Sequence, residues 1–275
     1  MSIFLAIFLG IVQGVTEFLP VSSSGHLSVL QNIFKLSATD DSHLLFDVML
    51  HMGTLIAICF SFRGELRRIF KDVFALARGE ASSPAPSPHV RLGLLVIVAT
   101  VPLIIVLPFY NLLRTLFFHI GFIGFMLLIT GALILVSAKF LKPGYKTEKT
   151  LTVGDAVMIG LAQLVAVIPG LSRAGATITV GLSRGADRDF AIKFSLLTSL
   201  PAVLGAMILT LIKAISNGID WSIIPAALVG LVVSAIVGFF AIAVMRAVMK
   251  SDKWVNFSYY CFIAGVVVIL LSIIL

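Results

Sequence analysis

Pro169-Gly-Leu-Ser-Arg-Ala-Gly175 breaks an apolar segment that runs from residue 153 to residue 182, and Pro20-Val-Ser-Ser-Ser-Gly25 breaks another that runs from residue 3 to residue 36. Pro and Gly interrupt each segment in its middle, so the fragments are too short to cross a bilayer easily. Each segment is therefore expected to be a re-entrant hairpin of two half-helices. Irregular backbone at membrane depth must be buried in protein or line a wet cavity, which makes both breaks candidate sites.

The composition of the whole chain is that of an integral membrane protein. Of its 275 residues, 59% are hydrophobic and 12% are charged, about half the charged share of a soluble domain. Apolar runs of helix length exclude a membrane β-barrel, whose strands have ~10 residues, and two cysteines exclude a disulfide scaffold. We predict an all-α integral membrane protein with two re-entrant hairpins and six transmembrane helices, at residues 45–62, 92–109, 117–138, 194–212, 223–245 and 257–275.

Basic residues predict the orientation in the membrane. The net charge is +7, but its carriers lie between apolar segments, where they set topology, so nucleic acid is not an expected partner. If the first hairpin enters from one face, 16 of the 20 Lys and Arg fall on the other face, including those of the predicted long loop 63–91. Lys35, Arg114 and Lys213 are the exceptions, with Arg173 inside a hairpin. The 16-residue side is then cytoplasmic in a multi-pass cell-membrane protein, with both termini and the mouth of the site outside.

The two broken segments resemble each other, which predicts an internal repeat. Gly10-Ile-Val-Gln13 matches Gly160-Leu-Ala-Gln163, and Pro20-Val-Ser-Ser23 matches Pro169-Gly-Leu-Ser172, so that Ser23 aligns with Ser172. Within a single membrane domain, residues 1–140 and 150–275 would each hold one hairpin and three spans. An odd number of spans inverts the second repeat, a design in which broken helices meet near the bilayer midplane.

Ionisable side chains inside membrane segments cost about 2.5–3.5 kcal/mol on insertion scales and are candidates for function. Glu17, His26 and Arg173 lie in the hairpins, whereas Asp47 and His51 lie near a span end and are expected mainly to pair structurally. Gln13 and Glu17 are four residues apart and share a helix face. They could hold a divalent cation, or Glu17 could act as a base.

The first break offers hydroxyls beside an imidazole. Ser22, Ser23, Ser24 and Gly25 at a helix start could cap the helix or bind an anion, and His26 adds an acid or base one turn away.

The second break offers a phosphate cradle. Small residues allow close backbone approach, Arg173 supplies a bidentate fork, and hydroxyls lie nearby; its other members are Gly170, Ser172, Gly175 and Thr177.

These two motifs, with Gln13, closely resemble the signature motifs of the bacterial undecaprenyl-diphosphate phosphatase family, which is associated with bacitracin resistance. The resemblance runs the length of the chain and rests on the residues 16–26 and 169–177. The family has Glu or Gln, then Glu four residues later, and here Gln13 and Glu17 fill these places. The Gln variant weakens the first position as an anionic metal ligand.

The resemblance implies a membrane hydrolase that removes the terminal phosphate of undecaprenyl diphosphate and so recycles the lipid carrier for cell-wall synthesis. It implies a divalent cation, Mg²⁺ or Ca²⁺, at Glu17 and Gln13, and a catalytic set of Glu17, Ser23, His26 and Arg173. Ser23 is the expected nucleophile with His26 as acid and base, although His26 or water could attack instead. An inverted-repeat transporter or lipid flippase is the main alternative, and a homodimer is left open.

Overall fold

The computed structural model describes residues 1–34, 36, 41–79, 86–142, 144–217, 221–249 and 251–274. Lys35 and much of the Pro/Ser part of the predicted long loop lie outside these described residues. Within the described ranges the chain forms helices and no β-strand, apart from one isolated bridge between Lys146 and Ala186. The protein is therefore an all-α integral membrane protein, as predicted.

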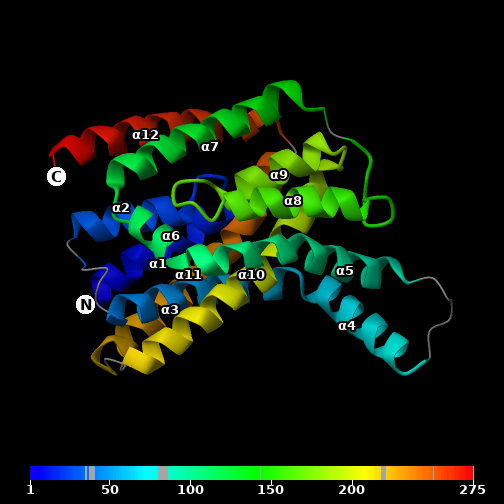
Figure 1. The fold of residues 1–275 in the computed structure, drawn as a ribbon, viewed down its shortest axis with the longest axis horizontal. Coiled ribbons are helices and arrows are strands. Elements are labelled where there is room, and N and C mark those ends of the chain that lie inside the picture. The colour runs from blue at the N-terminus through cyan, green and yellow to red at the C-terminus, as the bar shows by residue number, and fades with distance from the viewer. Residues whose placement is uncertain are drawn as a thin grey trace.

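Helices follow one another along nearly the whole described chain (Figure 1). In order they are α1 (Ile3–Phe18), α2 (Ser23–Ile33), α3 (Asp41–Ser61), α4 (Arg63–Ala77), α5 (Pro88–Thr100), the 3₁₀ helix η1 (Val101–Phe109), α6 (Tyr110–Leu116), α7 (Ile120–Phe140), α8 (Val153–Val165), α9 (Arg173–Ser183), α10 (Arg188–Asn217), η2 (Trp221–Ile223), α11 (Ile224–Met249), η3 (Asp252–Val255) and α12 (Asn256–Ile274).

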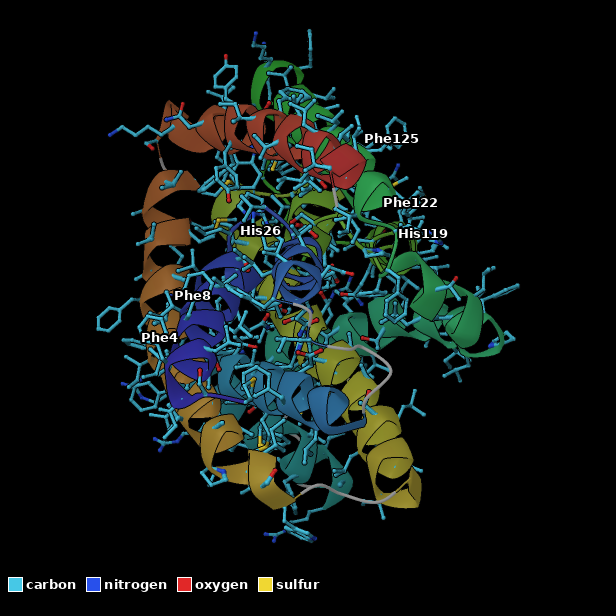
Figure 2. All side chains as sticks on the ribbon, turned by 90° about the vertical axis from the view of Figure 1, so that its left-hand side faces the viewer. Phe4, Phe8, His26, His119, Phe122 and Phe125 are labelled. Atoms are coloured by element: carbon cyan, nitrogen blue, oxygen red, sulfur yellow. The ribbon has the colours of Figure 1, made fainter. Side chains whose placement is uncertain are left out.

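The predicted spans agree with the helices that are long and apolar enough to cross a bilayer. Five such segments lie in the described residues, and a sixth is reached if α3 and α4, which bend by 77° at their junction, count as one span. The five are Pro88–Phe109, Ile120–Phe140, Arg188–Ile212, Trp221–Met249 and Lys253–Ile274. Exposed aromatic side chains around one end of the bundle, such as those of Phe4 and Phe125, point outward in Figure 2, as lipid contact requires.

Both predicted hairpins consist of two helices joined by an irregular turn. α1 ends at Phe18 and α2 begins at Ser23, while α8 ends at Val165 and α9 begins at Arg173. The Ser22 and Ser172 hydroxyls cap the second helix of each pair by accepting from the amides of Gly25 and Gly175. The polar breaks seen in the sequence are thus helix starts whose first-turn N–H groups face the turn.

Two parts of the fold differ from the prediction. The basic start of the predicted loop 63–91 is helix α4, whose Phe70 and Phe74 rings are exposed between cationic residues. Its apolar positions recur at helical spacing and suit a membrane interface. The predicted span 92–109 changes from α-helix to 3₁₀ helix at Val101, because Pro102 and Pro108 cannot donate to the α-helical hydrogen-bond ladder.

Small residues bring α1 and α3 against α11 at backbone distance. A Cβ on Gly10 would lie 2.9 Å from the carbonyl oxygen of Gly230, and one on Gly53 would clash with the Ser234 hydroxyl. Ser234 also donates to the carbonyl oxygen of Leu50 over 2.9 Å. Such close approach is typical of helix packing in membranes, where dispersion and interhelical hydrogen bonds replace the hydrophobic effect.

A buried carboxylate anchors the end of the second hairpin that lies away from its turn. Asp155, in the first turn of α8, accepts from Lys146 over 2.7 Å and from Arg184 over 2.8 Å, and it forms a capping box with Thr152. Burial alone would raise the pKa of Asp155, but these hydrogen bonds together hold that pKa well below its usual range. The anchor ties α8, the loop before it and the end of α9 together.

Candidate active site

One cavity of about 380 Å³ lies where the two hairpins meet. Its polar wall comes from α1, the two turns, α2, α3 and α9. Its apolar wall comes largely from α10 and the turn between α8 and α9, with Leu103 of η1. The lining includes Glu17, Ser22, Ser23, Ser24, Gln31, Asp47, His51, Leu103, Phe117, Gln163, Ala166, Val167, Leu171, Ser172, Arg173, Ala202, Val203, Ala206, Met207 and Thr210.

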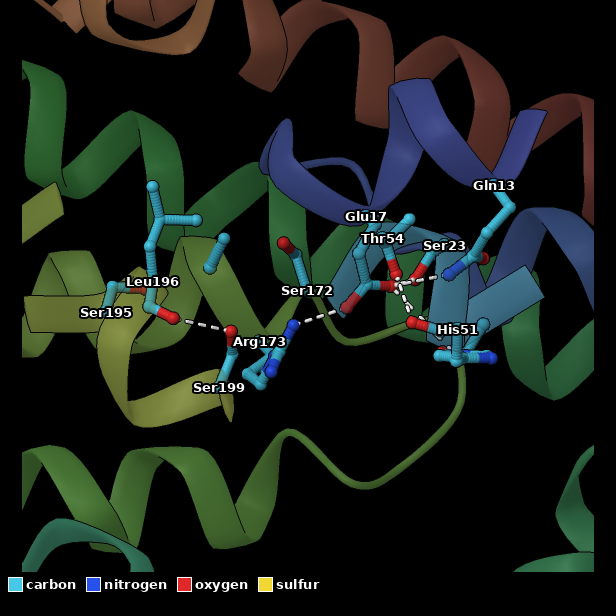
Figure 3. Close-up of polar contacts among 12 residues, drawn as sticks. Gln13, Glu17, Ser23, His51, Thr54, Ser172, Arg173, Ser195, Leu196 and Ser199 are labelled. Atoms are coloured by element: carbon cyan, nitrogen blue, oxygen red, sulfur yellow. Dashed lines mark hydrogen bonds and ion pairs between the residues drawn. The ribbon is translucent and has the colours of Figure 1, made fainter. Parts of the chain in front are cut away.

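Glu17 is the centre of the polar wall (Figure 3). One carboxylate oxygen, Oε2, accepts the hydroxyl proton of Ser23 over 2.6 Å and the amide of Gln13 over 3.1 Å. The other oxygen, Oε1, forms an ion pair with Nη2 of Arg173. The structure therefore brings together Glu17 and Ser23 of the first hairpin and Arg173 of the second, residues 150 or more positions apart in the chain.

The turn before Arg173 is held by a helix outside the hairpin. Thr130 of α7 donates from its hydroxyl to the carbonyl oxygen of Gly170 over 2.9 Å and accepts from the amide of Ser172 over 3.0 Å. Gly170 has φ +94°, and a Cβ there would lie 2.6 Å from a backbone oxygen of α7. Glycine is required at this place for both reasons. The Thr177 side chain of the same motif does not line the cavity, and its hydroxyl shares a hydrogen bond with that of Ser195.

The turn before Ser23 holds an unusual backbone conformation. Ser22 has φ +69°, the left-handed region that a residue with a side chain seldom adopts. Its hydroxyl caps α2 and lies 3.3 Å from that of Ser24, and its carbonyl oxygen lies 2.8 Å from Nδ1 of His26. Such conformations persist where the surroundings enforce them, and they cluster at functional sites.

The two turns contact each other reciprocally. A Cβ on Gly25 would lie 3.1 Å from Cα of Gly170, and one on Gly175 would lie 3.6 Å from the Pro20 side chain. The caps, Ser22 and Ser172, differ by 150 positions, so Ser23 corresponds to Arg173 as the first residue of each half-helix. The predicted alignment of Ser23 with Ser172 was wrong by one residue. The helix cap residues, and not the prolines, set which positions of the two turns correspond.

His26 does not join the cluster. Its Nε2 lies 2.7 Å from the Tyr260 hydroxyl, and its ring stacks on the Tyr260 ring. The ring lines a separate apolar cavity between α1, α2, α7 and α12. Figure 2 shows it inside the bundle. Ser23 and His26 thus lie on different sides of α2, and the predicted acid–base role of His26 stays a prediction.

The imidazole that does lie beside Glu17 is that of His51. Its Nε2 is 4.0 Å from Oε2 of Glu17, and its Nδ1 lies 2.8 Å from the carbonyl oxygen of Asp47. Asp47 accepts from the Gln31 amide over 2.7 Å. Sequence reasoning treated Asp47 and His51 as structural and omitted Gln31. Their spacing of four residues, facing a hairpin carboxylate, was the available signal.

The residues present do not fit a resident divalent cation at Gln13 and Glu17. Both Glu17 oxygens already accept from donors, and Arg173 neutralises the carboxylate. Gln13 offers its nitrogen and not its oxygen to Glu17. Nowhere in the described part of the chain do three or more His, Cys, Asp or Glu gather as metal ligands. Mg²⁺ and Ca²⁺ prefer several free oxygen ligands, whereas Gln13 Oε1 is the one oxygen of these two side chains without a partner in the described part of the chain.

Comparison with known proteins gives consistent matches over the whole chain. The family described as "Bacitracin resistance protein BacA" matches residues 6–267. The chain is 40% identical over 278 residues to the undecaprenyl-diphosphatase of Carboxydothermus hydrogenoformans, covering 99% of this chain and 98% of that protein. Undecaprenyl-diphosphatases of Alkaliphilus metalliredigens and Methanobrevibacter smithii are 38% and 37% identical, each over 99% of this chain and over 100% and 99% of their own lengths.

Proposed function

Since the chain belongs to the bacitracin resistance protein BacA family, we propose that it is a membrane phosphatase that hydrolyses undecaprenyl diphosphate to undecaprenyl phosphate and inorganic phosphate. Its relatives carry the name undecaprenyl-diphosphatase. The observation that carries the proposal is the contact of Ser23, Glu17 and Arg173 at the wall of one cavity. A hydroxyl, its proton acceptor and a phosphate-binding cation are the groups that phosphoryl transfer needs.

The geometry favours Ser23 as the nucleophile and Glu17 as its base. At 2.6 Å the Ser23 hydroxyl is within the range for proton transfer to Glu17. The Ser23 oxygen would attack the terminal phosphorus, its proton would pass to Glu17, and the bond to the lipid phosphate oxygen would break. Water would then cleave the phosphoserine and release phosphate. Arg173 and the amides at the start of α9 would stabilise the charge on the transferring group.

The apolar wall of the cavity suits the prenyl part of the substrate. Leu103, Val203, Ala206 and Met207 line the same cavity as the polar groups. A diphosphate at the turns would leave its hydrocarbon chain against these side chains. This placement supports a lipid diphosphate over a water-soluble phosphate ester.

The remaining expectations belong to the same proposal. The strong asymmetry of Lys and Arg supports a site that opens on the outer face, with both termini outside. The reciprocal contacts of the two turns support an inverted repeat of residues 1–140 and 150–275. A divalent cation, Mg²⁺ or Ca²⁺, would act on the substrate diphosphate, since the Glu17 carboxylate already pairs with Arg173 and accepts from Ser23 and Gln13.

Phosphate release from a prenyl diphosphate in detergent tests this function, because vectorial transport is impossible there. We expect wild-type protein to turn over and Ser23→Ala to lose most activity, while Ser22→Ala and Ser24→Ala keep a measurable share. Rapid quenching with terminally labelled substrate should leave the label on Ser23. Label on His26 would favour the alternative nucleophile, and no turnover in wild type would remove the proposal.

A further inference from the structure

The side-chain amide of Gln163 is a buried polar group that the rest of the described chain leaves unsatisfied. Gln163 is 2% exposed. Neither Nε2 nor Oε1 has a hydrogen-bond partner among the described residues. Buried amides without partners are rare in folded proteins because water is lost and nothing replaces it. Such a group indicates a partner that the described part of the chain does not supply.

The place of Gln163 identifies that partner. It lies on α8 in the wall of the same cavity as Ser172 and Arg173. One nitrogen of Arg173, Nη1, is also buried and has no partner within the described part of the chain. Two buried N–H groups of neighbouring elements thus border one cavity. Amide and guanidinium donors are the groups that bind phosphate oxygens.

The internal resemblance shows why this amide is left over. Gln13 stands 150 positions earlier in the first hairpin, and its amide donates to Glu17 four residues on. Four residues after Gln163 the chain has Val167, which cannot accept a hydrogen bond from its side chain. We propose that Gln163 is a further substrate-binding residue, whose amide hydrogen-bonds the terminal phosphate beside Arg173. This inference rests on the proposed function.

Phosphate affinity tests the inference directly. In Gln163→Met, a similarly sized apolar side chain, the KM for a short-chain prenyl diphosphate in detergent should rise by about tenfold or more. The inhibition constant for inorganic phosphate should rise by the same factor. The melting temperature should stay the same or increase, because an unsatisfied amide has been removed. A rise in KM with no change in phosphate inhibition would overturn the assignment to the terminal phosphate.

Thr179→Val is the matched control, since the Thr179 hydroxyl is also buried without a described partner but does not line the cavity. It should leave both constants unchanged. Equal effects of the two variants, or unchanged constants in Gln163→Met, would overturn the inference. If Gln163→Met does not fold, the same measurements are made on Gln163→Glu. Its negative charge should weaken inhibition by phosphate more than the loss of the amide alone. Wild-type turnover with normal phosphate binding in the variants refutes only this inference, whereas wild-type inactivity refutes the function itself.

Discussion

At the scale of single residues, Glu17 organises the site through hydrogen bonds within the protein. Its two oxygens accept from Ser23, Gln13 and Arg173, so each of these side chains has a fixed direction. Arg173 has one nitrogen on Glu17 and another without a described partner. Donors that are oriented in advance stabilise developing charge without further reorganisation.

Arg173→Lys should therefore reduce turnover by about 100-fold or more, although the positive charge remains. An ammonium group cannot hold Glu17 and bind phosphate through a planar fork at the same time. Steady-state phosphate release measures the effect. Arg184→Lys is the control, because Arg184 pairs with Asp155 away from the cavity. Near-normal turnover in Arg173→Lys would show that only bulk charge matters at this position.

At the scale of elements, helices outside the hairpins fix the turns. Thr130 of α7 bonds both Gly170 and Ser172 with one hydroxyl. The other turn is fixed by its own strained cap residue and by His26 against Tyr260 of α12. α7 and α12 pack along each other, as Figure 1 shows. Both turns thus depend on this helix pair for their position.

Thr130→Val should lower kcat about tenfold, because the turn that presents Arg173 loses two hydrogen bonds while the side-chain volume is kept. Thr130→Ser retains the hydroxyl and should recover most of the rate. The measurement is kcat beside the melting temperature of each variant. If Val and Ser variants lose rate equally, Thr130 serves packing and does not position the turn.

The anchor at Asp155 should make stability depend on pH in a defined direction. Its pKa in the folded protein is lowered, so its contribution is complete above the ordinary aspartate pKa of 3.8 and is lost as the pH falls further. Asp155→Asn should cost about 2 kcal/mol near neutral pH, since Lys146 and Arg184 lose their partner but stay partly hydrated. The melting temperatures of the Asp155→Asn variant and the wild type should converge in acid. A constant difference between the two melting temperatures at every pH would contradict this prediction.

Sequence reasoning reached the elements that carry strong local signals. Pro and Gly marked both breaks, and long apolar runs marked the spans. α4 was missed because its charge resembles that of a loop, although Phe70 and Phe74 repeat at helical spacing. His51 and Gln163 were missed as site residues because their neighbours come from distant parts of the chain. No local pattern shows that the Gln13 amide donates to Glu17 while the Gln163 amide has no partner among the described residues.

At the scale of the whole molecule, charge asymmetry predicts the orientation of the bundle. In a variant whose native Cys59 and Cys261 are replaced, Tyr145→Cys should resist a membrane-impermeant reagent in intact cells and react after lysis. Tyr145 is 88% exposed, so a side chain at this position is accessible on its own face. Thr115→Cys, on the opposite side, should react in intact cells. Labelling of the Tyr145→Cys variant from outside would contradict the orientation.

The close packing of α1 and α3 on α11 has a mechanical consequence. α1 and α3 belong to the first half of the chain and α11 to the second, so the halves are interlocked at Gly10, Gly53 and Ser234. A carrier that rocks one half against the other must open such a seam. In this protein that movement would separate closely packed backbones and break the hydrogen bond from the Ser234 hydroxyl to the Leu50 carbonyl oxygen. We therefore expect the frame around Glu17 to keep its position during turnover, while the lipid moves to the phosphate site and away from it.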